Sequence, residues 1–143
     1  GAREVERFGI KPRVALLSHS NFGNRDSASA RKMREALDII RKLDPELEVD
    51  GEMQADSALS ATKRGEKFAD SNLQGSANLL VMPNLDAGNI TSSVLHVLGG
   101  GVSIGPVLMG CKLAGHVVNS SISVRGLVNM TVVAVAQTVQ SGE

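Results

Sequence analysis

The stretch RVALLS, residues 13–18, decides the fold class of this chain. It is short, almost entirely apolar and preceded by a proline, which is typical of a strand buried on both faces of a parallel sheet. A polar loop, HSNFGNRDSA, follows it, and residues 29–43 then carry apolar side chains at helical spacing. A buried strand, a polar loop and an amphipathic helix together form the repeating unit of an α/β protein.

The rest of the chain extends this alternation of strands and helices. Further strands are predicted at 47–53, at 77–83, around 107–109 within the stretch 103–110, and at 116–119. Further helices are predicted at 55–68 (broken near Gly65), 85–100 and 123–140. Because the connections are short, we expect residues 1–143 to form one three-layer α/β/α domain with a mostly parallel sheet.

The composition excludes several classes of protein. The 143 residues carry 15 basic and 15 acidic side chains, so the net charge is zero, which argues against a nucleic-acid partner. The beginning of the chain does not resemble a signal peptide, and no apolar run reaches the roughly 20 residues that span a bilayer. We therefore expect a cytoplasmic protein without a membrane partner.

The predicted helix at 123–140 is apolar on almost every side. A helix of this kind is buried on more than one side, which a single sheet cannot achieve. We expect it to pack against a second copy or against a domain outside this sequence. The apolar residues concerned are Val124, Leu127, Val128, Met130, Val132, Val133 and Val135.

Polar loops that follow the predicted strands are the candidates for a ligand site, since ligands of open parallel sheets bind at the carboxyl ends of the strands. The alternative for each residue is turn formation or helix capping, which Ser, Asn and Asp commonly perform. The candidate ligand-binding residues are Ser18, Ser20, Asn21, Asn84, Asp86, Asn89, Gly105, Asn119 and Ser120.

Common catalytic and cofactor motifs are missing from these loops. GGGVSIG and GPVLMGCK match neither a dinucleotide-binding nor a phosphate-binding loop, and the three histidines are not spaced as metal ligands. Ser18 and His19 are adjacent on a strand end and would point to opposite faces, which disfavours a nucleophile pair. Asp50, Glu52 and Asp56 are either acid/base carboxylates or part of a solvated loop with a helix cap at Asp56 or Ser57.

Five stretches in register resemble the second half of phosphate acetyltransferases. They are RVALLSHSNFG, VDGEMQAD, ANLLVMPNLDAGNI, SIGPVLMG and LVNM, and the resemblance runs from about Pro12 to Thr138. Within that family, SHSNFG, SARKMREA and VNMT look most like the C-terminal phosphotransacetylase-like domain of bacterial hybrid NAD(P)-dependent malic enzymes.

This resemblance implies two α/β/α domains with a cleft for coenzyme A and acetyl phosphate, of which this chain is the second domain plus the C-terminal helix. It implies a homodimer or higher homo-oligomer, and a preceding malic enzyme domain that holds NAD(P) and a divalent metal. For this chain itself we expect no cofactor and no metal, with acetyl-CoA or coenzyme A as the ligand.

The resemblance also implies that catalytic residues are lost. Active family members carry an N-D-L-S-R-G segment followed by an aspartate; here the serine falls on Asn119, the arginine on Ser120 and the aspartate on Gly126. Acetyl transfer to phosphate develops negative charge that a guanidinium is suited to stabilise. We expect an acetyl-CoA-binding regulatory and oligomerisation domain; the alternatives are an active phosphate acetyltransferase fragment and a pure oligomerisation module.

Overall fold

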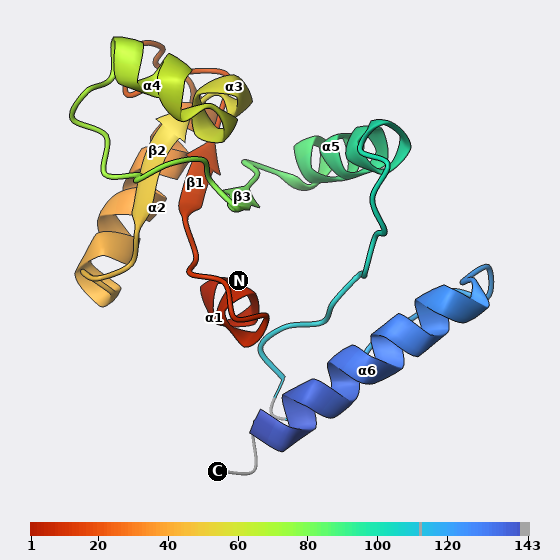
Figure 1. Ribbon diagram of the computed structural model, residues 1–143. Helices are drawn as coiled ribbons and strands as arrows, with labels where there is room; N and C mark the ends of the chain where they lie inside the picture. Colours follow the sequence, from red (N-terminus) through yellow and green to blue (C-terminus); the bar gives the residue numbers. More distant parts are fainter. Residues whose placement is uncertain (112, 141–143) are drawn as a thin grey trace. The chain divides into compact units, whose positions relative to one another are not determined.

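The computed structural model describes residues 1–111 and 113–140. The chain divides into two compact units, residues 1–92 and the part from residue 93 onward. The elements (Figure 1) are α1 (Ala2–Arg7), β1 (Val14–Leu17), α2 (Ala28–Leu43), β2 (Val49–Met53), α3 (Ala55–Leu59), α4 (Ala61–Lys67), β3 (Leu79–Val81), α5 (Leu85–Leu98) and α6 (Val124–Gln140).

The first unit contains a three-stranded parallel sheet with the order β2-β1-β3. The central strand β1 pairs Val14 with Val49 on one side and with Leu79 on the other. All four residues of β1 are buried, as the apolar run at 13–18 predicts for a strand covered on both faces. The expected α/β class with a parallel sheet is therefore confirmed.

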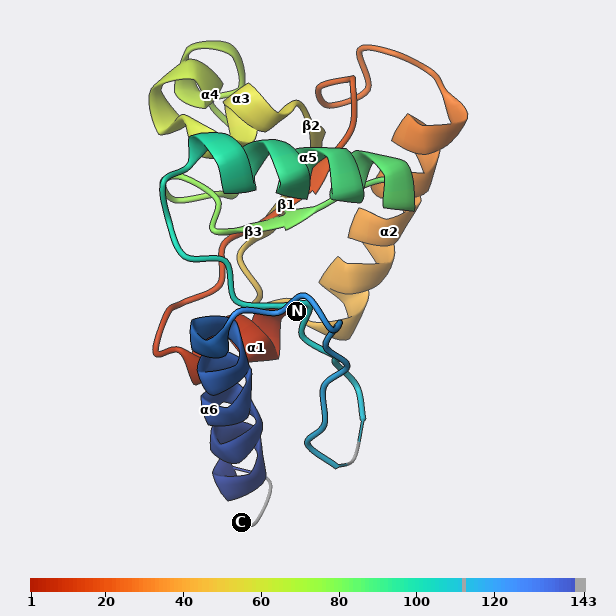
Figure 2. The same ribbon diagram turned by 90° about the vertical axis from the view of Figure 1, so that its right-hand side faces the viewer.

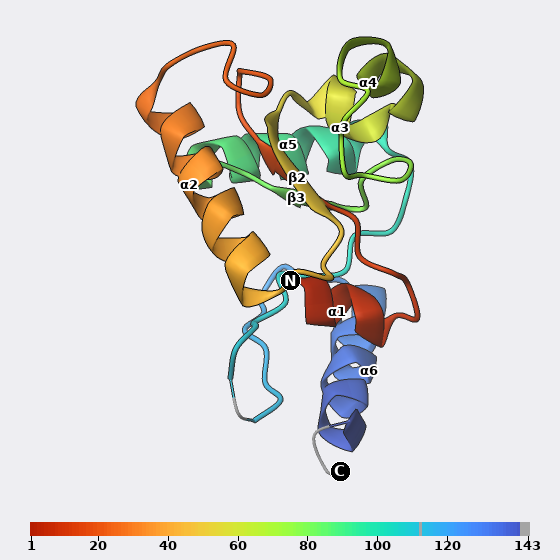
Figure 3. The same cartoon turned by 90° about the vertical axis from the view of Figure 1, so that its left-hand side faces the viewer.

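Helices and loops cover both faces of this sheet. On one face Val14, Leu16 and Val49 pack with Met33 and Leu37 of α2. On the other face, a cluster forms from Ala15, Leu17, Met53, Ala58, Leu73 and Ala77. Figure 3 shows α2 on one side of the strands and α3 on the other. This arrangement is the expected three-layer α/β/α architecture.

The helix predicted at 29–43 is present as α2, and its ends follow local rules. Ser27 is its N-cap, and the Ser27 hydroxyl accepts a hydrogen bond from the backbone N–H of Ala30 at 3.2 Å. Arg41 and Lys42 lie in the last turn, where basic side chains interact favourably with the helix dipole. Pro45, which cannot continue the helix, follows shortly after.

The single helix predicted at 55–68 is wrong in detail, because the structure has two helices there. The break falls at Ser60 and not at Gly65; Ser60 closes α3 and its hydroxyl accepts from the N–H of Lys63 as the N-cap of α4. The guanidinium of Arg64 is buried and donates to the carbonyl oxygens of Ser57 and Leu73 at 2.9 and 3.0 Å. This buried cation ties α4 to α3 and to the loop before β3.

The second unit differs from the sequence predictions more than the first unit does. The strands predicted around 107–109 and at 116–119 are wrong, since the structure has no strand in either range. Leu108, Met109 and Val117 are 48%, 53% and 76% exposed, so these apolar runs are not buried in a sheet here. A strand needs a neighbouring ladder of backbone hydrogen bonds, and these segments have none.

The helices α5 and α6 agree with the sequence pattern, whereas α1 was not predicted. α5 follows β3 directly (Figure 2), and α6 covers almost the whole segment predicted at 123–140. Val124, Val132 and Val139 of α6 are 82%, 61% and 71% exposed. That something outside this chain covers α6 stays a prediction. Among the described residues, no helix combines the length and apolarity that crossing a membrane would require.

Candidate functional site

A pocket of about 340 Å³ lies in the first unit where β1 and β3 end. We call it the strand-end pocket. Its polar wall comes from the loop after β1, the start of α2 and the segment that opens α5, and its apolar wall includes Leu17 and Met82. The polar lining residues are Ser18, His19, Ser29, Asn84 and Thr91. The structure thus brings Ser18 and Asn84 together, at the sheet edge where open α/β sheets bind ligands.

The loop after β1, which contains the candidates Ser18, Ser20 and Asn21, is held by hydrogen bonds within the loop and to Gln54. The Ser18 hydroxyl accepts from the N–H of Ser20 at 2.9 Å, and the buried Ser20 hydroxyl accepts from the N–H of Arg25 at 2.9 Å. The Asn21 side chain bonds the backbone and side chain of Gln54. Ser20 and Asn21 therefore shape the loop and do not line the pocket.

The candidate residues that follow β3 also differ in whether they line the strand-end pocket. Asn84 lines the strand-end pocket and its side-chain oxygen accepts from the N–H of Ala87 at 2.9 Å, which caps α5. Asp86 and Asn89 are exposed and do not line the strand-end pocket. Sequence reasoning missed Thr91, although its position seven residues after Asn84 puts both on one side of a helix.

The second pocket lies within the second unit and measures about 410 Å³. We call it the α6 pocket because the start of α6 forms one wall. It contains three positions singled out from the sequence, Gly105, Asn119 and Gly126. Ser120 is not among its lining residues. The other lining residues are His96, Ser103, Pro106, Val118, Ser121, Ile122, Ser123 and Met130.

The position of Gly126 leaves no space for a larger residue. A Cβ atom there would stand 2.8 Å from Cγ1 of Ile122 and 3.2 Å from the hydroxyl of Ser123. The Gly126 N–H also donates to that hydroxyl at 3.0 Å. An aspartate at this position would have to displace the β-branched Ile122, which has few alternative rotamers.

The α6 pocket is also almost without charge. None of the described residues that line it is Lys, Arg, Asp or Glu, and His96 is its one titratable side chain. Neutral polar groups supply the recognition chemistry. The Asn119 side-chain oxygen accepts from the backbone N–H and the hydroxyl of Ser121 at 3.2 and 2.8 Å. The pocket therefore offers hydroxyls, an amide and apolar walls.

The carboxylates of β2 face the protein interior. Asp50 is 4% exposed; one of its oxygens accepts from Arg41 at 3.0 Å and the other from the hydroxyl of Ser71 at 2.8 Å. Glu52 is fully buried and accepts from the N–H of Gly23 at 3.0 Å. The solvated-loop alternative is wrong for both residues, which instead anchor loops to β2.

The third of these carboxylates, Asp56, is exposed. It lies 3.5 Å from the ammonium of Lys63 and accepts from the N–H of Ser57. Neither Asp56 nor Ser57 caps α3, whose N-cap is Gln54. Within residues 1–111 and 113–140, no group of three His, Cys, Asp or Glu side chains is placed to hold a metal ion.

Comparisons with known proteins give the context of these pockets. The chain is 54% identical over 136 residues to a NAD-dependent malic enzyme of Rhizobium meliloti, and 52% identical over 137 residues to an NADP-dependent malic enzyme of Escherichia coli. Each alignment covers 95% of this chain but 18% of the relative. The chain thus spans less than a fifth of these relatives' length. A phosphate acetyltransferase of Paracoccus denitrificans is 42% identical over 128 residues, 90% of this chain and 40% of that relative.

Solved structures show the same relationship. A EutD phosphotransacetylase from Staphylococcus aureus superposes with a TM-score of 0.88 at 34% identity, over 95% of this chain and 42% of that one. A phosphotransacetylase from Streptococcus pyogenes gives a TM-score of 0.91 at 32% identity, over 97% and 42% of the two chains. The model of the Phosphate acetyl/butaryl transferase family matches residues 1–135. The chain therefore belongs to the phosphate acetyl/butaryl transferase family.

Proposed function

We propose that this chain is the C-terminal phosphotransacetylase-like domain of a malic enzyme, and that it binds acetyl-CoA without transferring the acetyl group. The malic enzyme relatives, at 54% and 52% identity, support the first part of this proposal. In a protein of this kind, oxidation of malate to pyruvate and CO₂, with NAD(P) and a divalent metal, takes place in the part outside this sequence.

The observation that carries the second part is the chemistry of the α6 pocket. Acetyl transfer from acetyl-CoA to phosphate brings an anionic nucleophile to a thioester and releases a thiolate, so it needs a cation and a proton donor. In the family resemblance the arginine falls on Ser120 and the aspartate on Gly126, neither of which supplies a charge, and none of the described residues that line the pocket is Lys, Arg, Asp or Glu. Removing one charge-stabilising donor typically costs about 10²–10³ in rate.

The same pocket retains what binding requires. Coenzyme A reaches its thiol through a long neutral arm with two amides, which hydrogen-bond to neutral partners. The hydroxyls of Ser103 and Ser121 and the amide of Asn119 are such partners, and Ile122 and Met130 provide apolar contact. Ligand binding can therefore persist after the catalytic charges are lost.

Regulation follows if acetyl-CoA has different affinities for two states of the complete enzyme. The exposed apolar side chains of α6 support a packing partner for that helix, which we propose to be the rest of the same polypeptide or a second copy. Burial of α6 in an oligomer would connect the domain to the other subunits.

The test uses the full-length malic enzyme. Isothermal titration measures acetyl-CoA binding, and release of free coenzyme A thiol in the presence of phosphate measures acetyl transfer. We expect binding without thiol release. Thiol release above the uncatalysed rate would support the alternative of an active phosphate acetyltransferase. Absence of binding at millimolar acetyl-CoA would support a pure oligomerisation module.

A further inference from the structure

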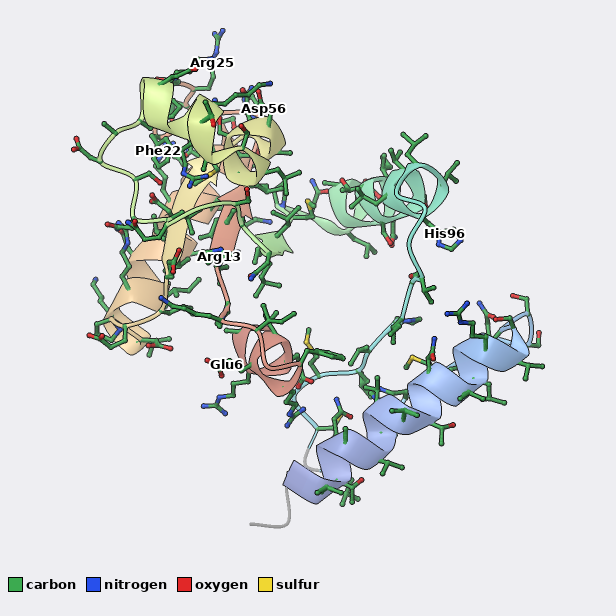
Figure 4. All side chains as sticks on the ribbon, viewed as in Figure 1. Glu6, Arg13, Phe22, Arg25, Asp56 and His96 are labelled. Atoms are coloured by element: carbon green, nitrogen blue, oxygen red, sulfur yellow. The ribbon has the colours of Figure 1, made fainter. Side chains whose placement is uncertain are left out.

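His96 occupies a distinctive position in the second unit. It lies near the end of α5, and Figure 4 shows its side chain projecting away from that helix. The ring lines the α6 pocket together with Ser103 and Gly105 of the following loop and Asn119 and Gly126 near the start of α6. No hydrogen bond within the described residues engages the His96 side chain, so its ring nitrogens remain available to a ligand.

Among the described residues, no charged side chain lines the α6 pocket beside His96. On α6, Arg125 is exposed and does not line the pocket. In the loop between α5 and α6, Cys111 is exposed, and His116 accepts a hydrogen bond from the N–H of Leu108 and is not a lining residue.

We propose that His96 contacts the bound acyl-CoA and makes its affinity depend on pH, so that the imidazolium form binds it more tightly. This inference rests on the proposed function. Imidazole is the side chain whose charge ordinarily changes between pH 5 and 8. A hydrogen bond from a charged donor is stronger than one from a neutral donor, by an amount that corresponds to about a 5- to 10-fold change in affinity.

The acceptor on the ligand is a thioester carbonyl or a phosphate oxygen of coenzyme A, both of which accept hydrogen bonds. A cation at His96 would recognise such an oxygen, and the measurement of thiol release separates this recognition from acetyl transfer. His96 would then act as a sensor of protonation state within a binding site that is otherwise neutral.

The experiment is isothermal titration of acetyl-CoA into the full-length malic enzyme at pH 6.0 and pH 8.5. Two variants separate a contribution of the His96 side chain from protonation of the ligand phosphates. His96→Gln keeps a neutral hydrogen-bonding side chain, and His96→Arg keeps a positive charge at both pH values. Circular dichroism and size-exclusion chromatography verify that each variant is folded and assembled.

We expect the Kd of the natural protein to rise about 5- to 10-fold from pH 6.0 to pH 8.5. The Kd of H96Q should be high at both pH values, and that of H96R low at both. The same pH dependence in H96Q as in the natural protein would overturn the inference and leave the proposed function standing. Absence of acetyl-CoA binding by the natural protein at either pH would overturn both.

Discussion

Asn21 and Gln54 form a reciprocal pair: the Asn21 amide donates to the side-chain oxygen of Gln54 at 2.9 Å, and the backbone N–H of Gln54 donates to Asn21 Oδ1 at 2.8 Å. The Gln54 amide also donates to the carbonyl oxygen of His19 at 2.9 Å. Together these contacts fasten the loop after β1 to the end of β2.

Glu52 reinforces the same attachment. Its carbonyl oxygen accepts from the N–H of Phe22 at 2.7 Å, and its carboxylate accepts from the N–H of Gly23. Phe22 has a φ of +47°, a left-handed conformation that is uncommon for a bulky residue and persists only where surrounding contacts impose it. The loop that carries Ser18 and His19 to the strand-end pocket is therefore held in a defined shape.

Replacement of the Gln54 side chain should loosen this loop. Gln54→Ala removes two side-chain hydrogen bonds, each worth about 0.5–1.5 kcal/mol, and the exposure of Gln54 places the total near the low end. We expect faster hydrogen exchange at Gly23 and Arg25 with little change at β1. Gln74→Ala, which removes an exposed side chain without a hydrogen bond in the structure, is the matched control. Unchanged exchange in the loop would contradict this account.

Arg64 should contribute more to stability than any exposed cation of α4. Its guanidinium is buried without a carboxylate partner and is satisfied by backbone carbonyl oxygens, including those of Ala58 and Gly75. Arg64→Met leaves these oxygens unsatisfied, so we expect a loss of about 2–4 kcal/mol in the free energy of unfolding. Urea denaturation measures the loss. Lys67→Met, at an exposed position in the same helix, should change stability by less than about 0.5 kcal/mol.

Glu48 should make the free energy of unfolding depend on pH in the acidic range. Burial raises the pKa of Glu48, but the N–H of Gln74 and the ammonium of Lys11 outweigh it and hold the pKa below the ordinary value of 4.5. A lowered pKa in the folded state adds stability above the unfolded pKa, and this stability is lost as pH falls through the folded value.

The corresponding variant is Glu48→Gln, which keeps the side-chain oxygen but removes the charge. At pH 7 it should be less stable than the natural chain by up to about 1 kcal/mol, since Lys11 is solvent-exposed. The difference should shrink to zero as pH falls below the lowered pKa. Urea denaturation between pH 7 and pH 3 follows this change, with Glu46→Gln at an exposed neighbouring position as control. A constant difference across this range would contradict the assignment.

Replacement of Gly126 by the aspartate of the family motif should weaken ligand binding and should not restore acetyl transfer. Gly126→Asp places a Cβ against Ile122, and overpacking of this kind costs about 1–3 kcal/mol. We expect acetyl-CoA to bind the full-length variant at least about 10-fold more weakly, without acetyl phosphate production. Gly65→Ala is the matched control, because a Cβ there meets nothing within 4 Å and should slightly stabilise α4. Acetyl transfer by G126D would show that the pocket still accommodates catalysis.

The first unit could be predicted closely because its signals are local. The apolar run before Ser18, the amphipathic pattern that ends at Leu43 and the proline after Met82 fix β1, α2 and the end of the third strand segment without knowledge of the rest. The split at Ser60 was missed because a serine within a helical pattern serves equally as a helix residue and as an N-cap.

The second unit was predicted less well because the structure of its apolar segments depends on which other segments lie beside them. Leu108 and Val117 belong to β-prone runs, but a strand forms only beside another strand, which these segments lack here. The α6 pocket gathers His96, Gly105, Asn119 and Gly126 from widely separated positions. The family resemblance identified Asn119 and Gly126, whereas nothing in the local sequence indicated that His96 lies in the same pocket.

The central claim is that this domain binds acetyl-CoA without transferring its acetyl group. The most direct test is isothermal titration of acetyl-CoA into the full-length protein, which we propose to be a malic enzyme, with malate oxidation and thiol release followed in parallel. Saturable binding that changes the rate of malate oxidation, with no thiol release in the presence of phosphate, is the predicted result. Binding accompanied by acetyl phosphate formation, or no binding at millimolar acetyl-CoA, would contradict it.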